Sequence, residues 1–145
     1  MNKLYYSLFA FFFFLIPNAQ IINIPDANFK AILLKASPGY NIASTQTPYG
    51  YGNVDTHNTI DINGDGEIQF SEANLIKYLN VYDSGITNLE GIKSFTNLQY
   101  LGCTNNQISN LNVSGLTNLE NLFCFNNQLT SLDVSGLTKL QKLFC

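Results

Sequence analysis

The chain has 145 residues, seven basic side chains that are all lysine, and ten acidic ones, which gives a formal net charge of −3 at pH 7. This length suits one domain with short additional segments. Proteins that bind nucleic acid need a basic patch, and anionic membranes attract polybasic segments. Because the sequence has no arginine and no lysine cluster, we expect no nucleic-acid partner and no binding to anionic lipid.

The first 20 residues, MNKLYYSLFAFFFFLIPNAQ, have the pattern of a secretory signal peptide. Lys3 precedes an apolar run over residues 8–16, and Pro17 and Ala19 follow as a helix breaker and a small residue of the cleavage region. The run is shorter than the roughly 20 residues that span a bilayer, although an N-terminal membrane anchor is the alternative. We expect a secreted or cell-surface protein without a membrane span after cleavage.

A short helix is predicted over residues 24–37, IPDANFKAILLKAS. Asp26 suits the N-cap position, and an apolar stripe that includes Phe29 and Leu33 has helical spacing. The next segment, residues 38–59, is rich in turn-forming residues. A structureless run of this length is unusual in a compact domain unless it is functional or held at its ends.

Residues 60–72, IDINGDGEIQFSE, match the calcium-binding loop pattern D-x-[DN]-x-[DN]-G-x5-E at every position. Gly66 permits the sharp bend that such a loop needs, and Ca²⁺ prefers a shell of six to eight oxygen ligands. The predicted ligands are Asp61, Asn63, Asp65, the backbone carbonyl of Glu67, Gln69 through a water molecule, and Glu72. The alternative is an acidic turn that binds no ion.

The neighbours of this EF-hand-like loop (residues 61–72) indicate a structural Ca²⁺ ion rather than a sensor or a catalytic metal. The residues before Asp61 show no helical period, no second loop accompanies it, and the short helical turn after it runs directly into the next segment. The pattern therefore lacks the pair of flanking helices whose relative angle Ca²⁺ changes in a sensor. We expect Ca²⁺ to join an N-terminal cap, residues 21–75, to the segment that follows.

A repeat of 21 residues fills the rest of the chain. Residues 98–118 and 119–139 are two close copies, residues 140–145 begin a third, and residues 76–97 form a looser first copy. The shared skeleton L-x-x-L-x-(C/V)-x-x-(N/S)-x-(I/L)-x-x-L is the leucine-rich repeat pattern, in which neighbouring coils stack and share one core. The sequence predicts an α/β solenoid of about 21-residue coils with parallel strands, preceded by the helix and calcium-loop cap.

Two polar or weakly polar columns follow from this period. Asn106 and Asn127 close successive strands, where a buried amide must pair with backbone groups, and we expect this asparagine ladder to begin at Asn106. Cys103, Cys124 and Cys145 occupy an inward strand position. Because parallel strands lie about 4.8 Å apart and a disulfide needs a Cβ separation near 3.8 Å, we expect three buried thiols without a bridge.

Several segments together resemble the internalin-like, secreted leucine-rich repeat proteins of bacteria, particularly those common in Bacteroidota. These segments are IPDANFKAILL, DINGDGEIQFSEA, LEGIKSFTNLQYL and CTNNQISNLNVSGLTNLENLFCFNNQLTSLDVSGLTKL. Members of this group usually have more coils and often a C-terminal sorting domain, whereas this sequence ends inside a repeat. The resemblance therefore implies a truncated member of the group.

The outward residues of the repeat strands would line a concave face that meets ligands. The residues expected to point outward are Tyr78, Asn80, Tyr82, Tyr100, Gly102, Thr104, Asn121, Phe123, Phe125, Lys142 and Phe144. Of these, Tyr78, Tyr82, Tyr100, Asn121, Phe123, Phe125 and Phe144 are the predicted ligand-binding residues. Aromatic side chains anchor interfaces and stack on sugars, although Tyr and Phe also favour strands for purely structural reasons.

We therefore expect a secreted or cell-surface leucine-rich repeat protein that binds an extracellular protein or glycan through this face. No enzyme activity is expected, because His57 is the only histidine and no nucleophile–base pair is evident. The same observation, with the lack of a CxxC pair, argues against zinc. The alternatives are a non-catalytic recognition fragment of a larger secreted enzyme and a truncated product without independent function.

Overall fold

The computed structural model describes residues 20–145, so the predicted signal peptide lies, except for its last residue, outside the described residues. The elements are the helices α1 (Ala27–Lys35) and α2 (Phe70–Ala73), the 3-10 helix η1 (Ile92–Ser94), and the strands β1 (Ala43–Ser44), β2 (Tyr78–Asn80), β3 (Tyr100–Gly102), β4 (Asn121–Phe123) and β5 (Lys142–Phe144). Within the described range no helix has the length and apolar character that crossing a membrane requires.

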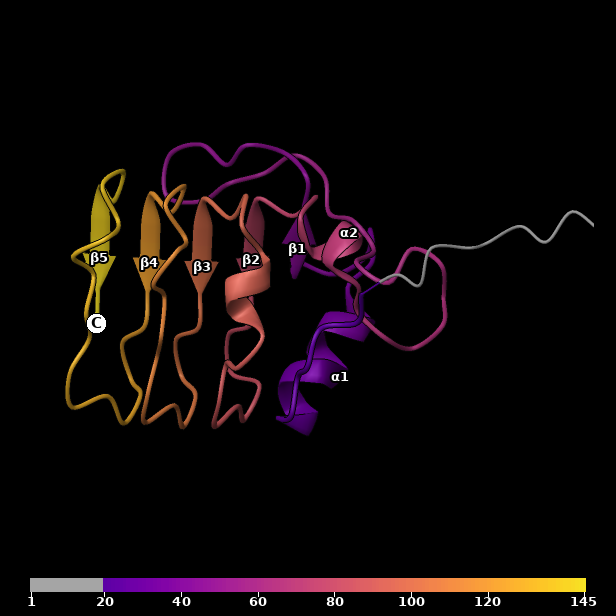
Figure 1. The fold of residues 1–145 in the computed structure, drawn as a ribbon. Helices are drawn as coiled ribbons and strands as arrows, with labels where there is room; N and C mark the ends of the chain where they lie inside the picture. Colours follow the sequence, from indigo (N-terminus) through magenta and orange to yellow (C-terminus); the bar gives the residue numbers. More distant parts are fainter. Residues whose placement is uncertain (1–19) are drawn as a thin grey trace, which may run out of the picture.

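The coils stack side by side and form one sheet with the order β1-β2-β3-β4-β5 (Figure 1). Strands β2 to β5 are parallel, and each pairs residue for residue with the strand one coil further on. The predicted solenoid of parallel coils is therefore confirmed. Strand β1 was not expected; it comes from the turn-rich segment before the repeats and pairs antiparallel with β2.

The core runs along the solenoid between the sheet and the coil bottoms. Leu79, Leu101 and Leu122 occupy the middle position of successive strands and are fully buried, because the middle residue of a three-residue strand points to the face opposite its neighbours. Leu98 and Leu119 extend the same core two residues before the strands β3 and β4. Burying each of these side chains contributes roughly 1.5–3 kcal/mol relative to exposure.

The helix α1 begins where the sequence indicates. The side chain of Asp26 accepts a hydrogen bond from the backbone N–H of Phe29 at 2.9 Å, which caps the helix. Phe29 and Leu33 are buried against the first coil side of the core. The helix thus closes the N-terminal end of the solenoid (Figure 1).

Candidate ligand-binding face and calcium loop

The outward side chains of the sheet form straight rows because the strands are in register. Tyr78, Tyr100, Asn121 and Lys142 are the first row, and the third strand positions form a second row from Asn80 to Phe144. We call the surface made by these rows and by the next outward position of each coil, which holds Tyr82, Thr104 and Phe125, the strand face. Its geometry follows directly from the 21-residue period, since equal coils place equivalent residues next to each other.

Four aromatic rings form a continuous line across the strand face. The ring centroids of Tyr78 and Tyr100 lie 4.7 Å apart, those of Tyr100 and Phe123 lie 5.3 Å apart, and those of Phe123 and Phe144 lie 5.0 Å apart. The line changes from the first row to the second beside Gly102. A Cβ at Gly102 would lie 3.1 Å from the Tyr100 ring, so a residue without a side chain lets Tyr100 lean toward Phe123.

Part of this face is covered by the chain itself. Residues 45–57, which we call the strap, arch across the sheet from β1 (Figure 1). Gly52 of the strap lies against the Tyr100 ring, and the Lys142 ammonium lies 4.0 Å from the centroid of the Tyr51 ring. Lys142 also donates a hydrogen bond to the carbonyl of Gly50. The strap therefore contacts the first row at both β3 and β5.

The predicted ligand-binding residues consequently differ in accessibility. Tyr78 is 3 % exposed and Asn121 is 7 % exposed, and the hydroxyl of Tyr78 donates a hydrogen bond to the side chain of Asn41 at 2.8 Å. Tyr100 and Phe123 are half-buried. The exposed members are Tyr82, Phe125 and Phe144, and we call these three residues the open aromatic patch.

Burial keeps the first row uncharged. Burial raises the pKa of Tyr100 to about 12, and it also raises the pKa of Tyr78. Both phenols are therefore neutral at physiological pH. The covered row offers hydroxyl and amide groups and ring faces, with the Lys142 ammonium as its charged group.

A polar ladder borders the open aromatic patch. Asn126 donates its side-chain amide to Asn105 at 2.8 Å, and Asn105 donates to the hydroxyl of Tyr82 at 2.9 Å. Asn105 and Asn126 adopt left-handed backbone conformations, with φ of 58° and 56°, which asparagine tolerates better than most residues. The patch thus combines aromatic side chains with fixed amide groups.

The predicted calcium loop has the backbone turns that its pattern requires. The Asp61 carboxylate accepts hydrogen bonds from the N–H groups of Gly64 at 2.8 Å and Gly66 at 3.0 Å. Gly66 has a φ of +79°, a conformation that glycine adopts without strain. The buried Glu72 carboxylate accepts from the N–H groups of Ile62 at 2.8 Å and Gln69 at 3.0 Å, so it joins the beginning and the end of the loop.

The atoms predicted to bind the ion are all carboxylate, amide or carbonyl oxygens, which suit Ca²⁺. Asp65 accepts hydrogen bonds from the side-chain amides of Asn63 at 2.9 Å and Gln69 at 2.8 Å, so both amides present nitrogen to this carboxylate. Among residues 20–145, no three His, Cys, Asp or Glu side chains lie close enough to hold an ion. An ion in this loop would therefore require the amides of Asn63 and Gln69 to turn their oxygens toward it.

Glu67 uses its side chain for another contact. Its carboxylate forms an ion pair with Lys30 of α1 at 2.7 Å, while the role predicted for Glu67 in the loop involves only its backbone carbonyl. Ile22 also donates its backbone N–H to the carbonyl of Ile68 at 2.8 Å. These contacts join the loop to the N-terminal segment, which is the arrangement expected for a cap.

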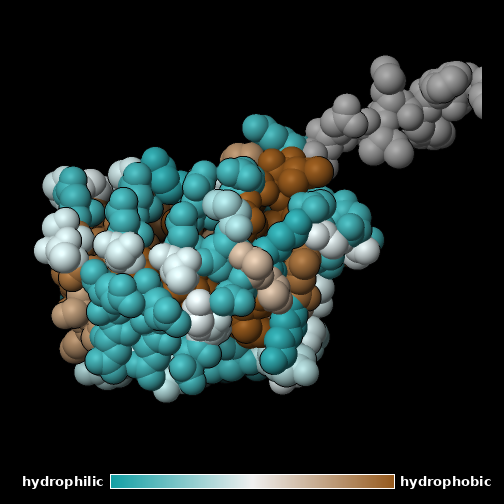
Figure 2. Space-filling model, turned by 90° about the horizontal axis from the view of Figure 1, so that it is seen from below, coloured by the Kyte–Doolittle hydropathy of each residue, from teal (hydrophilic) through white to brown (hydrophobic). Residues whose placement is uncertain are grey.

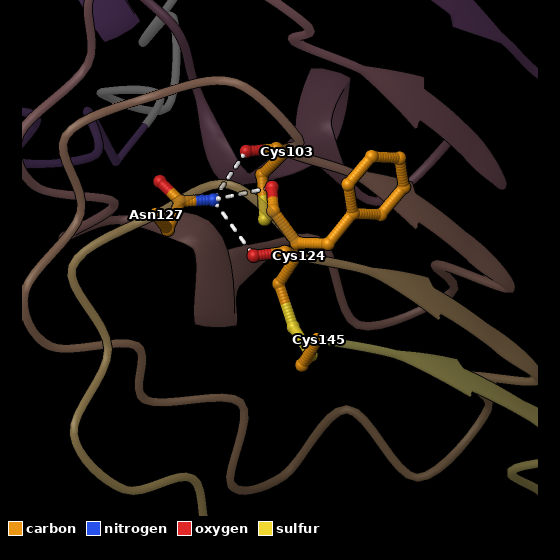
Figure 3. The surroundings of a disulfide bond; sticks show 5 residues. Cys103, Cys124, Asn127 and Cys145 are labelled. Carbon is orange, nitrogen blue, oxygen red and sulfur yellow. Dashed lines mark hydrogen bonds between the residues drawn. A yellow bond between two sulfur atoms is a disulfide. The ribbon is translucent and has the colours of Figure 1, made fainter.

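The asparagine ladder begins at Asn106, as the sequence predicts. Its amide nitrogen donates to the carbonyls of Val81 and Cys103, both at 2.9 Å, and its oxygen accepts from the N–H groups of Ser84 at 3.1 Å and Ile86 at 3.0 Å. One side chain thus bonds two coils. Asn127 repeats the pattern one coil further on (Figure 3).

The prediction of three unbridged thiols is wrong for two of the cysteines. Cys124 and Cys145 form a disulfide (Figure 3), and Cys103 remains a buried thiol. The Cα atoms of the bonded pair lie 4.5 Å apart. Disulfides span Cα separations of about 4.4–6.8 Å, a range that also includes the mean strand spacing, so the prediction failed because it compared that spacing with a Cβ separation. Burial raises the pKa of the Cys103 thiol to about 12, which makes it unreactive.

These coils and rows give the chain a leucine-rich repeat solenoid fold, and this fold is similar to that of internalins. Among solved structures, the functional domain of InlJ from Listeria monocytogenes, which includes a cysteine ladder, is 42 % identical with a TM-score of 0.53, and the match covers 55 % of this chain and 18 % of that one. The internalin InlF from Listeria monocytogenes is 25 % identical with a TM-score of 0.54, covering 82 % of this chain and 29 % of that one.

No protein-family model matches the chain, and no curated protein matches it. The chain spans less than a third of the length of each of the two internalin structures. The comparisons therefore support the internalin-like fold. A ligand of this chain has to be inferred from the residues on its own surface.

Proposed function

We propose that this protein is an exported leucine-rich repeat protein that binds an extracellular protein ligand through the open aromatic patch of its strand face. The observation that carries the proposal is the exposure of three large aromatic side chains on this face: Tyr82 is 53 % exposed, Phe125 is 44 % exposed and Phe144 is 46 % exposed. Interfaces between proteins draw much of their binding energy from such aromatic anchors.

The underside of the repeats supports this choice of face. Seen from the coil bottoms, the surface over the repeats is mostly hydrophilic (Figure 2). The exposed aromatic side chains of the open aromatic patch, which could anchor a protein ligand, lie on the strand face and not on this hydrophilic surface. The internalin-like fold supports a binding role rather than catalysis, and export would follow from the signal-like residues 1–20.

The test is an array of extracellular proteins and glycans probed with the purified chain from residue 21. We expect protein hits whose affinity falls at least tenfold in Phe125→Ala and in Tyr82→Ala, because each change removes an aromatic anchor. Tyr40→Ala is the matched control, since Tyr40 is 49 % exposed and lies outside the patch. Hits that all three variants bind with equal affinity would contradict the proposal. Hits among the glycans alone would show that the ligand is a glycan and not a protein.

We further propose that Ca²⁺ binds the loop of residues 61–72 and stabilises the cap without taking part in ligand binding. Chelator should lower the melting temperature by several degrees, because a site filled at ten times its dissociation constant contributes about 1.4 kcal/mol. Differential scanning calorimetry with and without Ca²⁺ measures this shift.

Asp65→Ala should remove the response to Ca²⁺, whereas Asp133→Ala should retain it. Asp133 also accepts a backbone hydrogen bond in a tight turn, from Ser135 at 2.9 Å, but it lies in the last complete repeat, so it matches the change in charge and turn chemistry. Identical melting of the unmodified chain in Ca²⁺ and in chelator would rule out the structural ion.

A further inference from the structure

The strap is a closed loop whose two ends are fixed to each other. The N–H of Asn58 donates to the carbonyl of Ala43 at 2.8 Å, and the N–H of Thr45 donates to the side chain of Asn58 at 3.0 Å. Ala43 and Ser44 also pair with β2. The base of the strap is therefore part of the folded sheet, and only its tip depends on contacts with the strand face.

The tip fits the first row through a position that only glycine can fill. Gly52 is buried and has a φ of +93°, and a Cβ there would lie 2.1 Å from the Tyr100 ring. Tyr100 is itself stacked on Tyr78. The fit between a bare backbone and a ring is specific, and it covers surface that would otherwise face solvent.

A second contact holds the tip from the far end of the sheet. Lys142 on β5 donates to the carbonyl of Gly50, 92 residues away in sequence, and its ammonium lies over the Tyr51 ring. Asn121 lies between Tyr100 and Lys142 in the same row and is buried. The strap tip therefore contacts the first row at β3 and at β5, the two strands on either side of Asn121.

The two tyrosines of the strap tip face mainly solvent. Tyr49 and Tyr51 at the tip are 56 % and 70 % exposed, so little of their apolar surface stabilises the closed position. The backbone of the tip is bonded to itself, with Tyr49 and Asn53 exchanging hydrogen bonds of 2.9 Å. A unit with its own turn and few outside contacts can open without unfolding the coils.

We propose that the strap is an internal occupant of a peptide-binding row, latched by Lys142, and that an extended segment of a protein ligand displaces it. The ligand segment would carry a glycine opposite Tyr100, as the strap does, and would gain the row Tyr78, Tyr100 and Asn121. This proposal rests on the proposed function, because the displaced strap makes the open aromatic patch continuous with the first row.

The latch is tested without any ligand, by native cleavage with chymotrypsin after Tyr49 and Tyr51. We expect cleavage at least tenfold faster in Lys142→Met, which loses the hydrogen bond and the contact of the charge with the ring, and in Gly52→Ala, which cannot seat against Tyr100. Lys139→Met is the control, because Lys139 lies in the same stretch of chain and donates instead to Asn118 at 2.8 Å. Cleavage of Lys142→Met at the unmodified rate would overturn the proposal.

The peptide-binding row is tested with a synthetic peptide of residues 45–57. A full-length variant in which a short Gly-Ser linker replaces the strap should bind this peptide, whereas the unmodified chain should not, because its row is occupied. A peptide with Gly52→Ala should bind at least tenfold more weakly. Failure of the linker variant to bind, with its melting temperature intact, would overturn the row as a peptide site. Neither experiment depends on finding the natural ligand.

Discussion

Asn106→Ala is expected to lower the free energy of unfolding by about 3 kcal/mol. The variant loses the five hydrogen bonds between the buried amide and the backbone of two coils, and buried groups left without a partner cost roughly 1–3 kcal/mol each. The carbonyl of Val81 and the N–H groups of Ser84 and Ile86 would lose this partner, whereas the carbonyl of Cys103 keeps its hydrogen bond from Asn127. Urea unfolding followed by circular dichroism measures the change.

Asn127→Ala and Asn110→Ala complete this series. Asn127 makes the same type of bonds but is only half-buried, so water can replace part of what it loses and the effect should be smaller. Asn110 is exposed, and its removal should change the free energy of unfolding by less than about 0.5 kcal/mol. Equal effects at Asn106 and Asn110 would show that the ladder does not stabilise the coils.

Asp26→Ala is expected to destabilise the protein by about 2 kcal/mol, because the carboxylate has two functions. It caps α1 through Phe29, and it accepts hydrogen bonds from the first coil, from the N–H and hydroxyl of Thr87 at 2.9 and 2.7 Å and from the N–H of Asn88 at 3.1 Å. Loss of an N-cap costs about 1 kcal/mol, and hydrogen bonds to charged groups contribute more than neutral ones.

The contribution of Asp26 should depend on pH. Burial tends to raise the pKa of this carboxyl, but the hydrogen bonds from Phe29, Thr87 and Asn88 outweigh burial and lower it below the ordinary value of 3.8. A lowered pKa in the folded state means that the stabilisation is complete above pH 4 and is lost as the pH falls through the folded-state pKa. Asp26→Asn, which retains one acceptor oxygen, should fall between the unmodified chain and Asp26→Ala.

The stability difference between the unmodified chain and Asp26→Ala, measured by thermal unfolding from pH 7 to pH 2, checks this dependence. A difference that stayed constant down to pH 2 would show that the charge of Asp26 does not contribute. Asp55→Ala is a suitable control, since Asp55 is an exposed strap carboxylate that accepts from the Tyr49 hydroxyl at 3.0 Å and bonds neither α1 nor the repeats.

The repeats could be predicted because their information is local. Inward leucines, the asparagine ladder and the strand positions recur with the coil period, and stacking alone then sets which residues are neighbours. The N-cap at Asp26 was likewise readable from a few adjacent residues. The calcium pattern predicted the bend at Gly66, but ion binding in that loop is still a prediction.

The strap could not be predicted because its contacts are distant in sequence. Residues 45–57 have neither a helical nor a strand period. Their partners Tyr100 and Lys142 lie in the 21-residue repeats, and the spacing of those repeats gives no information about contacts with residues outside them. The spacing Tyr-Gly-Tyr-Gly at residues 49–52 was the available signal, since a glycine between aromatics in a long loop marks a close approach of backbone to another surface. That signal does not say which surface.

The disulfide between Cys124 and Cys145 was missed for a related reason. The period places the two residues directly after neighbouring strands, at a Cα separation that disulfides span, but whether their sulfurs bond depends on the orientation of the two side chains. That orientation arises from how neighbouring coils pack. The sequence pattern contains no information about it.

The register of the sheet has a consequence for how this surface can change over generations. Each strand residue faces its equivalent one coil away, so an in-frame duplication or loss of one coil's codons would lengthen or shorten every row by a single step while leaving the remaining steps aligned. The strap, whose base is fixed at β1 and whose tip reaches β5, has a constant reach. Gene rearrangement in whole coils could therefore alter how much of the strand face the strap covers without any substitution within it.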